Sequence, residues 1–156
     1  MIAFNPSSTI AVKGEQHLEP VLDVTDILIV NDEEAELIAH EGDIHANLEA
    51  LTKEIPTVII TRGSDGVIAH HDDTRYSAEP HQCTVQETTG AGDAFSSGFL
   101  AAHLHDLPST DRIKLGMLNA ENVLCHYGAH NDLLNWEQAR SALRDDERDV
   151  REKPVQ

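Results

Sequence analysis

Cysteine, aromatic residues and positive charge are all scarce in this 156-residue chain. Its two cysteines, Cys83 and Cys125, lie far apart without CxxC spacing, so the sequence indicates neither a disulfide framework nor a zinc site. Only 11 Lys and Arg residues stand against 28 Asp and Glu residues, which gives a formal net charge of −17. Nucleic acid is therefore excluded as an expected partner, because its binding depends on Lys and Arg that neutralise phosphates.

Long apolar runs and two common nucleotide-binding motifs are also absent. No run reaches the ~18 apolar residues of a membrane span, and the first residues do not resemble a signal peptide, so we expect a cytoplasmic protein that contacts no membrane. Neither GxxxxGK[ST] nor GxGxxG occurs, which argues against a P-loop NTPase and a Rossmann dehydrogenase.

Ten histidines invite a metal hypothesis, above all at His70-His71-Asp72-Asp73. Neighbouring residues on a hairpin point apart, however, and neither HExxH nor Cys/His spacing occurs. We therefore interpret this segment as a solvated hairpin tip.

Strand and helix patterns alternate along the chain, and the hydrophobic fraction of 40% indicates a folded protein of one domain. Apolar β-branched runs predict strands at 2–5, 26–30 and 57–61, with a hairpin continuing through 67–69 and 75–79. Helical spacing predicts helices from residue 32 and over 44–54, 91–105, 110–126 and 135–143, the last capped by Asn135. Residues 144–156 are charged and almost without apolar residues, so we expect a disordered tail. The alternation predicts an α/β sheet that binds ligands at the carboxyl ends of its strands.

Gly90-Ala91-Gly92-Asp93, which leads into a helical pattern, is the most informative motif. Glycine lets the backbone approach a ligand closely, and the free N–H groups at a helix N-terminus favour a phosphate. An acid beside such an anion site can take a proton from a hydroxyl that attacks phosphorus. The alternative is a glycine-rich helix start that binds nothing.

Two further polar groups follow predicted strands. Asn31 and Glu34 come directly after the second strand, and their oxygens are the ligands that a hard cation such as Mg²⁺ prefers. Plain helix capping is the alternative for this pair. The segment 61–66 follows the third strand, and its alternative is an ordinary hairpin turn.

These segments together resemble the PfkB/ribokinase family of sugar and nucleoside kinases. Asn31 to Glu36 is similar to the family's Asn-x-x-Glu motif, and Thr61 to Gly66 is similar to its Thr-x-Gly-x-x-Gly nucleotide turn. Residues 89–95, Thr-Gly-Ala-Gly-Asp-Ala-Phe, match its second signature almost letter for letter. Asn119-Ala120 and Gly128-Ala129 are similar to the closing helix and loop beside the adenine.

The resemblance covers residues 2 to about 134 and implies half of a known fold. It implies the C-terminal half of a ribokinase-like three-layer α/β/α fold, with a partial sheet over residues 1–143. The activity implied is ATP-dependent phosphoryl transfer to an alcohol group of a sugar or nucleoside. Asp93 would be the catalytic base, with the transferred phosphoryl group held by amides at Gly90, Ala91 and Gly92. Asn31 and Glu34 would hold Mg²⁺, and the nucleotide would be lined by Thr61, Gly63, Ser64, Gly66 and Asn119.

The chain departs from the family pattern in two ways. Glu87 stands where the family usually has Asp, which puts activation by a monovalent cation in doubt. The family's N-terminal half carries a sugar-binding acid, a Gly-Gly substrate motif and a β-strand lid, and none of these has a counterpart within residues 1–156. We therefore expect the ATP-binding and catalytic-base half of a kinase. The alternatives are a truncated, non-catalytic nucleotide-binding module and one half of a split kinase, completed by an N-terminal half-chain or by self-association.

Overall fold

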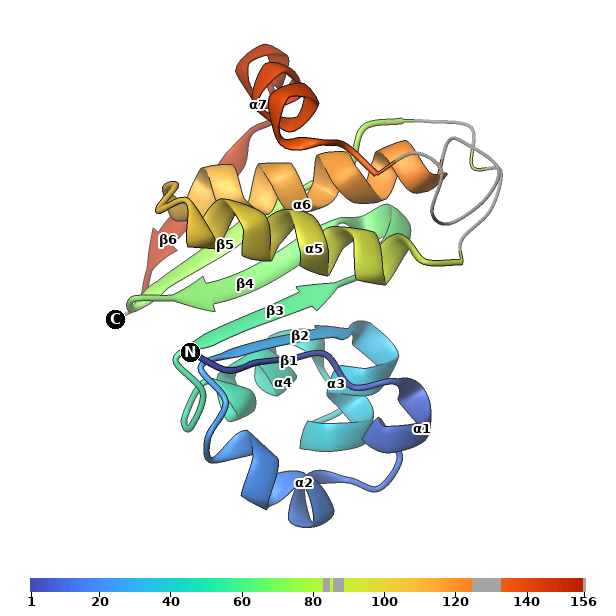
Figure 1. Ribbon diagram of the computed structural model, residues 1–156. Coiled ribbons are helices and arrows are strands. Elements are labelled where there is room, and N and C mark those ends of the chain that lie inside the picture. Colours follow the sequence, from blue (N-terminus) through green and yellow to red (C-terminus); the bar gives the residue numbers. More distant parts are fainter. Residues whose placement is uncertain (83–84, 86–88, 125–132, 156) are drawn as a thin grey trace. The chain divides into compact units, whose positions relative to one another are not determined.

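The computed structural model describes residues 1–82, 85, 89–124 and 133–155 (Figure 1). The chain divides into two compact units, one of Met1–Ser77 with the C-terminal residues from Arg151 on, the other of Ala78–Val150. No helix within the described residues is both long and apolar enough to cross a membrane. Several residues discussed above lie outside the described residues: Cys83, Glu87, Cys125, Gly128 and Ala129.

A mixed sheet forms the centre of the first unit. Its described strands follow one another in the order β1-β2-β3-β4-β5-β6. The first three strands are parallel, whereas β3 and β4 pair as the antiparallel hairpin that the sequence predicts. Their bounds are Ala3–Phe4 (β1), Ile27–Asn31 (β2), Thr57–Thr61 (β3), Val67–His71 (β4), Thr74–Ala78 (β5) and Val150–Pro154 (β6).

Four α-helices are described in the first unit, and local signals explain two of them. Helix α3 (Asp32–Ala39) begins at the Asn31 cap, and α4 (Ile44–Leu51) begins at Asp43, whose carboxylate accepts from His45 N and Ala46 N. Both are predicted, although α4 ends three residues earlier than expected. The sequence patterns predict neither α1 (Ser8–Ala11) nor α2 (Glu15–Leu22).

The two missed helices have weak local signals but bury apolar side chains. Helix α1 is a single turn, and α2 follows Gly14, which has φ 75°, and contains Pro20. Proline in a helix interior removes a backbone hydrogen bond, which hides the pattern from propensity arguments. Ala11, Leu18 and Leu22 nevertheless belong to the main core cluster. Tertiary packing therefore stabilises these helices more than local preference does.

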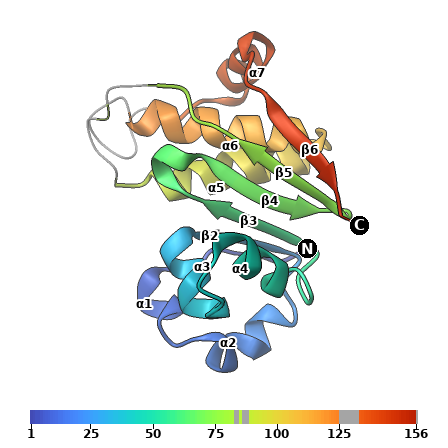
Figure 2. The ribbon, with the colours of Figure 1, turned by 180° about the vertical axis from the view of Figure 1, so that it is seen from behind.

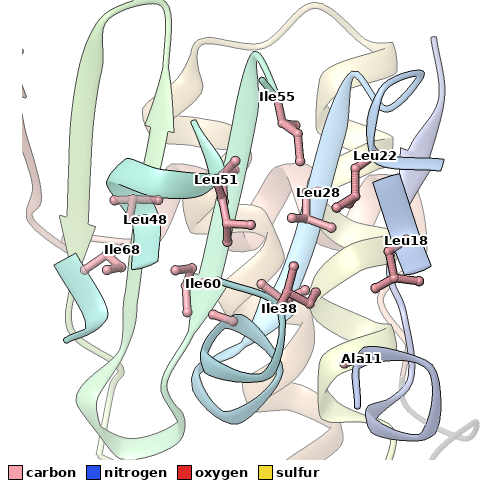
Figure 3. Packing of buried hydrophobic residues seen from close by; sticks show 13 residues of the cluster. Ala11, Leu18, Leu22, Leu28, Ile38, Leu48, Leu51, Ile55, Ile60 and Ile68 are labelled. Carbon is pink, nitrogen blue, oxygen red and sulfur yellow. The ribbon is translucent and has the colours of Figure 1, made fainter. Parts of the chain in front are cut away.

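Alternate strand residues and the helices of the first unit share one core. Because side chains alternate along a strand, Leu28 and Val30 point to the same face, as do Val58 and Ile60. Figure 3 shows side chains of this cluster meeting between the strands and helices. Burial of each such side chain stabilises the fold by about 1.5–3 kcal/mol.

The expected disordered tail over 144–156 is instead ordered in part. Helix α7 (Trp136–Asp145) extends two residues into it, and residues 150–154 form β6 beside β5 (Figure 2). Val155 N–H donates to the Asp73 carbonyl at 2.8 Å. Charged, exposed residues are typical of an edge strand, whose stability comes from backbone pairing rather than from buried side chains. Composition alone therefore indicated disorder where pairing gives a strand.

Helices α5 (Ala91–Leu104), α6 (Ser109–Leu124) and α7 make up most of the second unit. Helices α5 and α6 lie side by side (Figure 1) and approach closely at two glycines. A Cβ on Gly98 would lie 2.7 Å from the Leu115 carbonyl oxygen, and one on Gly116 would lie 2.9 Å from the Phe95 ring. The predicted cap of α7 is confirmed, because Asn135 forms a capping box with Gln138.

Candidate active site

Asn31 and Thr61 lie next to each other at the carboxyl end of the parallel strands. Asn31 ends β2, Thr61 ends β3, and the register of the two strands pairs them directly. The Thr61 hydroxyl faces the neighbouring strand and lies 3.4 Å from the Val30 carbonyl oxygen. The expectation that these polar residues gather at one edge of the sheet is confirmed for this pair.

Asn31 and Glu34 form a capping box, the alternative that the sequence left open. Asn31 Oδ1 accepts from Glu34 N–H at 2.8 Å, and Glu34 Oε2 accepts from Asn31 N–H at 3.0 Å. The other carboxylate oxygen, Oε1, accepts from the Ser8 hydroxyl at 3.0 Å. Glu34 is buried, with 7% of its surface exposed. Fixing the start of α3 is therefore a role of this pair whatever else it binds.

The capping box leaves part of the Glu34 carboxylate available to a cation. A carboxylate offers about four acceptor sites, and the capping box and Ser8 use two of them. Among the described residues no cluster of three or more His, Cys, Asp or Glu side chains could hold a metal. A divalent cation at Glu34 would thus need further oxygen ligands from outside these side chains, as Mg²⁺ commonly takes from water and phosphate.

The turn after β3 combines an internal brace with exposed backbone. Residues Gly63–Asp65 form a short 3₁₀ helix, η1, closed by a hydrogen bond from Arg62 N–H to the Gly66 carbonyl at 2.8 Å. Gly63 and Gly66 have φ values of 52° and 81°, a region that favours glycine over other residues. Gly63 and Ser64 are exposed. This geometry suits an ordinary hairpin turn, and it also presents backbone groups that a ligand can reach.

The motif in the second unit forms the start of α5. Gly90, with φ 83°, is the N-cap, and its carbonyl accepts from Ala94 N–H at 2.9 Å. A Cβ on Gly92 would meet no atom of the described residues within 4 Å, so this backbone is not covered by that part of the chain. Asp93 lies in the first turn and is exposed, with no ion pair to any part of the chain that the structure describes. The predicted helix start is confirmed, and its N–H groups and dipole favour an anion.

Asn119 is buried and its side chain is engaged within the second unit. Its Nδ2 donates to the Ala94 carbonyl at 2.7 Å and to the Ser97 hydroxyl at 3.0 Å, and its Oδ1 accepts from Leu134 N–H at 3.0 Å. Only 5% of the residue is exposed. The family resemblance implies that Asn119 lines the nucleotide, and the sequence alone does not predict these bonds. One signal was present, because Asn119 stands four residues from Leu115 and from Val123, on the buried stripe of α6.

The histidine segment belongs to a hairpin and forms no metal site with described residues. Strand β4 continues through His71, so the tip is narrower than expected and consists of Asp72 and Asp73, both with positive φ. The His71 Nδ1 lies 2.8 Å from the Thr57 hydroxyl. Burial lowers the pKa of His70 from its ordinary value of 6.5, although Asp73 opposes this shift.

Solved structures of kinases share the fold of this chain. The nucleoside kinase of Methanocaldococcus jannaschii, a member of the ribokinase family, matches with a TM-score of 0.80 at 23% identity, over 94% of this chain and 48% of that one. A structure from Escherichia coli in complex with ATP and Mg²⁺ matches with a TM-score of 0.76 at 17% identity, over 84% of this chain and 43% of the other. At these identities the comparison shows the fold alone, which is a ribokinase-like α/β fold.

Sequence comparison adds the family. The family described as pfkB family carbohydrate kinase matches residues 6–136. A protein of Archaeoglobus fulgidus, described as an uncharacterized sugar kinase, is 30% identical over 132 residues, which are 85% of this chain and 53% of that protein. This chain therefore belongs to the pfkB family of carbohydrate kinases, as its motifs indicate. It spans about half the length of the relatives it matches.

Proposed function

We propose that this chain carries the ATP site and the catalytic base of a kinase that phosphorylates an alcohol group of a sugar or nucleoside. The observation that carries the proposal is the start of α5, where exposed Asp93 follows the glycine cap Gly90 and the exposed Gly92. Family membership supports it independently. The M. jannaschii and A. fulgidus relatives, a nucleoside kinase and a sugar kinase by description, leave both substrate classes open.

In this proposal the start of α5 performs the chemistry. The substrate hydroxyl oxygen bonds to the γ-phosphorus while the bond from that phosphorus to the bridging oxygen of ATP breaks, and ADP leaves. Asp93 accepts the proton that the hydroxyl loses, a role that fits a carboxylate without an ion-pair partner among the described residues. The amides of residues 90–92 lie at the positive end of the helix dipole and stabilise the negative charge of the moving phosphoryl group.

Residues at the carboxyl ends of β2 and β3 would bind the nucleotide and the cation. Thr61, Gly63, Ser64 and Gly66 would line the nucleotide, which agrees with the exposure of Gly63 and Ser64. Glu34 and Asn31 would hold Mg²⁺ and its waters, since the donor set is oxygen and part of the Glu34 carboxylate is uncommitted. When bound, Mg²⁺ would neutralise charge on the phosphates.

The base assignment is tested with Asp93→Asn. The variant keeps the shape of the side chain but cannot accept the proton, so we expect phosphoryl transfer to fall by roughly 10²- to 10⁴-fold. ATP binding, measured by calorimetry, should stay within about threefold of the unchanged protein, because the amides remain. The assay uses this chain alone and mixed with an N-terminal half from a relative. Equal turnover by the variant in whichever assembly is active would refute the assignment.

The coverage of the relatives favours a second candidate, a nucleotide-binding module that needs another polypeptide for catalysis. The chain spans about half of those proteins, and β1 is the edge of the described sheet, with Met1 and Ile2 exposed beside it. An exposed edge strand can pair with a partner or a second copy. This candidate predicts ATP binding without sugar-dependent ADP release by the purified chain. Turnover by the chain alone would exclude it, and a clean monomer at high concentration would count against self-association.

A further inference from the structure

Asn119 joins three segments of the second unit through one short side chain. It sits on α6, its Nδ2 reaches the first turn of α5 at Ala94, and its Oδ1 holds the backbone at Leu134. Leu134 immediately precedes Asn135, the cap of α7. The donor and acceptor groups of this amide are thus engaged inside the protein.

The approach of α5 to α6 makes this reach possible. A Cβ on Gly98 would lie 3.0 Å from Asn119 Cβ and 2.7 Å from the Leu115 carbonyl oxygen, so any larger residue at 98 would push the helices apart. The carbonyl that Asn119 binds belongs to Ala94, the neighbour of Asp93. That carbonyl also accepts from the Ser97 hydroxyl at 2.9 Å. The first turn of α5 is therefore held both from within and from α6.

We propose that Asn119 is a positioning residue that fixes the start of α5 and does not itself contact the nucleotide. The polar atoms of this buried amide are already bonded, so it would have to break those bonds to reach a ligand. The cost would be comparable to that of leaving a buried polar group without a hydrogen bond. By holding the Ala94 carbonyl, it sets the direction of the preceding amides and of Asp93. The functional consequence, though not the structural one, rests on the proposed kinase site.

Amide hydrogen exchange in the absence of ligand tests the structural part. Asn119→Ala removes all three bonds, so the Leu134 amide and the hydrogen-bonded amides of residues 94–98 in α5 should exchange about tenfold faster. Asn119→Asp keeps the shape and an acceptor for Leu134 but loses the Nδ2 donor, so only the α5 amides should be affected. Ser97→Ala is the matched control, because it removes the hydroxyl bond to the Ala94 carbonyl but keeps the bond from Asn119 Nδ2 to that carbonyl, so exchange should change by less than about threefold.

Each outcome decides the structural part. Unchanged exchange at the start of α5 in Asn119→Asp would overturn the proposal, and so would an equal effect of Ser97→Ala. If Asn119→Ala does not fold, Asn119→Asp carries the test because it conserves volume and the Leu134 bond.

Binding of ATP and of inorganic tripolyphosphate separates positioning from direct contact. If Asn119 acts through the α5 amides, Asn119→Ala should weaken the binding of both ligands by the same factor, about threefold to tenfold. If Asn119 instead contacts the adenine, the substitution should weaken the binding of ATP alone, and this result would overturn the proposal. If the unchanged protein binds neither ligand, the proposed function fails, while the exchange data still decide whether Asn119 holds α5.

Discussion

The start of α3 and the start of α5 are both helix N-termini with an acid in the first turn, yet they use that acid differently. At α3, Glu34 is buried and bonded to Asn31 and Ser8. At α5, Asp93 is exposed, with no ion pair to the described residues, and the cap is a glycine in place of a polar side chain.

The difference separates an acid that builds the fold from one that is free for chemistry. The capping box satisfies backbone donors at α3, which stabilises that helix. Gly90 forms no such side-chain bond, so the amides of α5 stay available to an anion. A first-turn acid is therefore weak evidence for a site, whereas a first-turn acid beside an uncapped, open backbone is stronger evidence.

The largest effect that could break this comparison concerns magnesium dependence. Glutamine can replace glutamate in a capping box, so Glu34→Gln should keep the helix start while removing the charge. If Glu34 also holds Mg²⁺, the half-saturating Mg²⁺ concentration for ATP binding should rise roughly tenfold or more. Titration of Mg²⁺ at fixed ATP, with Asp32→Asn as an exposed control on the same turn, measures this. An unchanged titration would leave Glu34 with the structural role alone.

Stability should show the opposite ranking of the two acids. Glu34→Ala leaves Asn31 N–H and the Ser8 hydroxyl without their acceptor, so we expect a loss of about 1–2 kcal/mol in the free energy of unfolding. Asp93→Ala loses a helix-dipole interaction of about 0.3–1 kcal/mol but gains helix propensity of up to about 0.7 kcal/mol. Its net effect should therefore be close to zero. Urea unfolding of both variants measures the two free energies. A larger loss of stability in Asp93→Ala than in Glu34→Ala would contradict the distinction between a structural and a catalytic acid.

The features that the sequence predicts depend on local contacts, and those that it does not predict depend on distant ones. Helix α3, the β3–β4 hairpin, the start of α5 and the Asn135 cap depend on residues close in sequence, and all were predicted. Strand β6 depends on pairing with β5, about 75 residues away in the chain, and its charged residues gave no apolar signal.

The candidate site shows the same limit. Its residues could be named from motifs, because each motif is contiguous in sequence. The bonds that occupy them could not always be found. The Asn31–Glu34 box spans three residues and follows a local capping pattern, whereas the bond from Asn119 to Ala94 spans 25 residues and follows no local pattern.

The smallest expected effect concerns His70, which lies in β4 and can add its own pH dependence to an activity profile. Because burial lowers the pKa of His70 in the folded state, the unfolded chain binds a proton more readily below pH 6.5. Stability should therefore fall slightly as the pH drops from about 6.5 toward 5. In His70→Gln the urea unfolding midpoint should no longer fall across that pH range. An identical fall in the variant would mean that a group other than His70 causes it. Activity profiles recorded in the His70→Gln background would then report on the base without a change in folding beneath them.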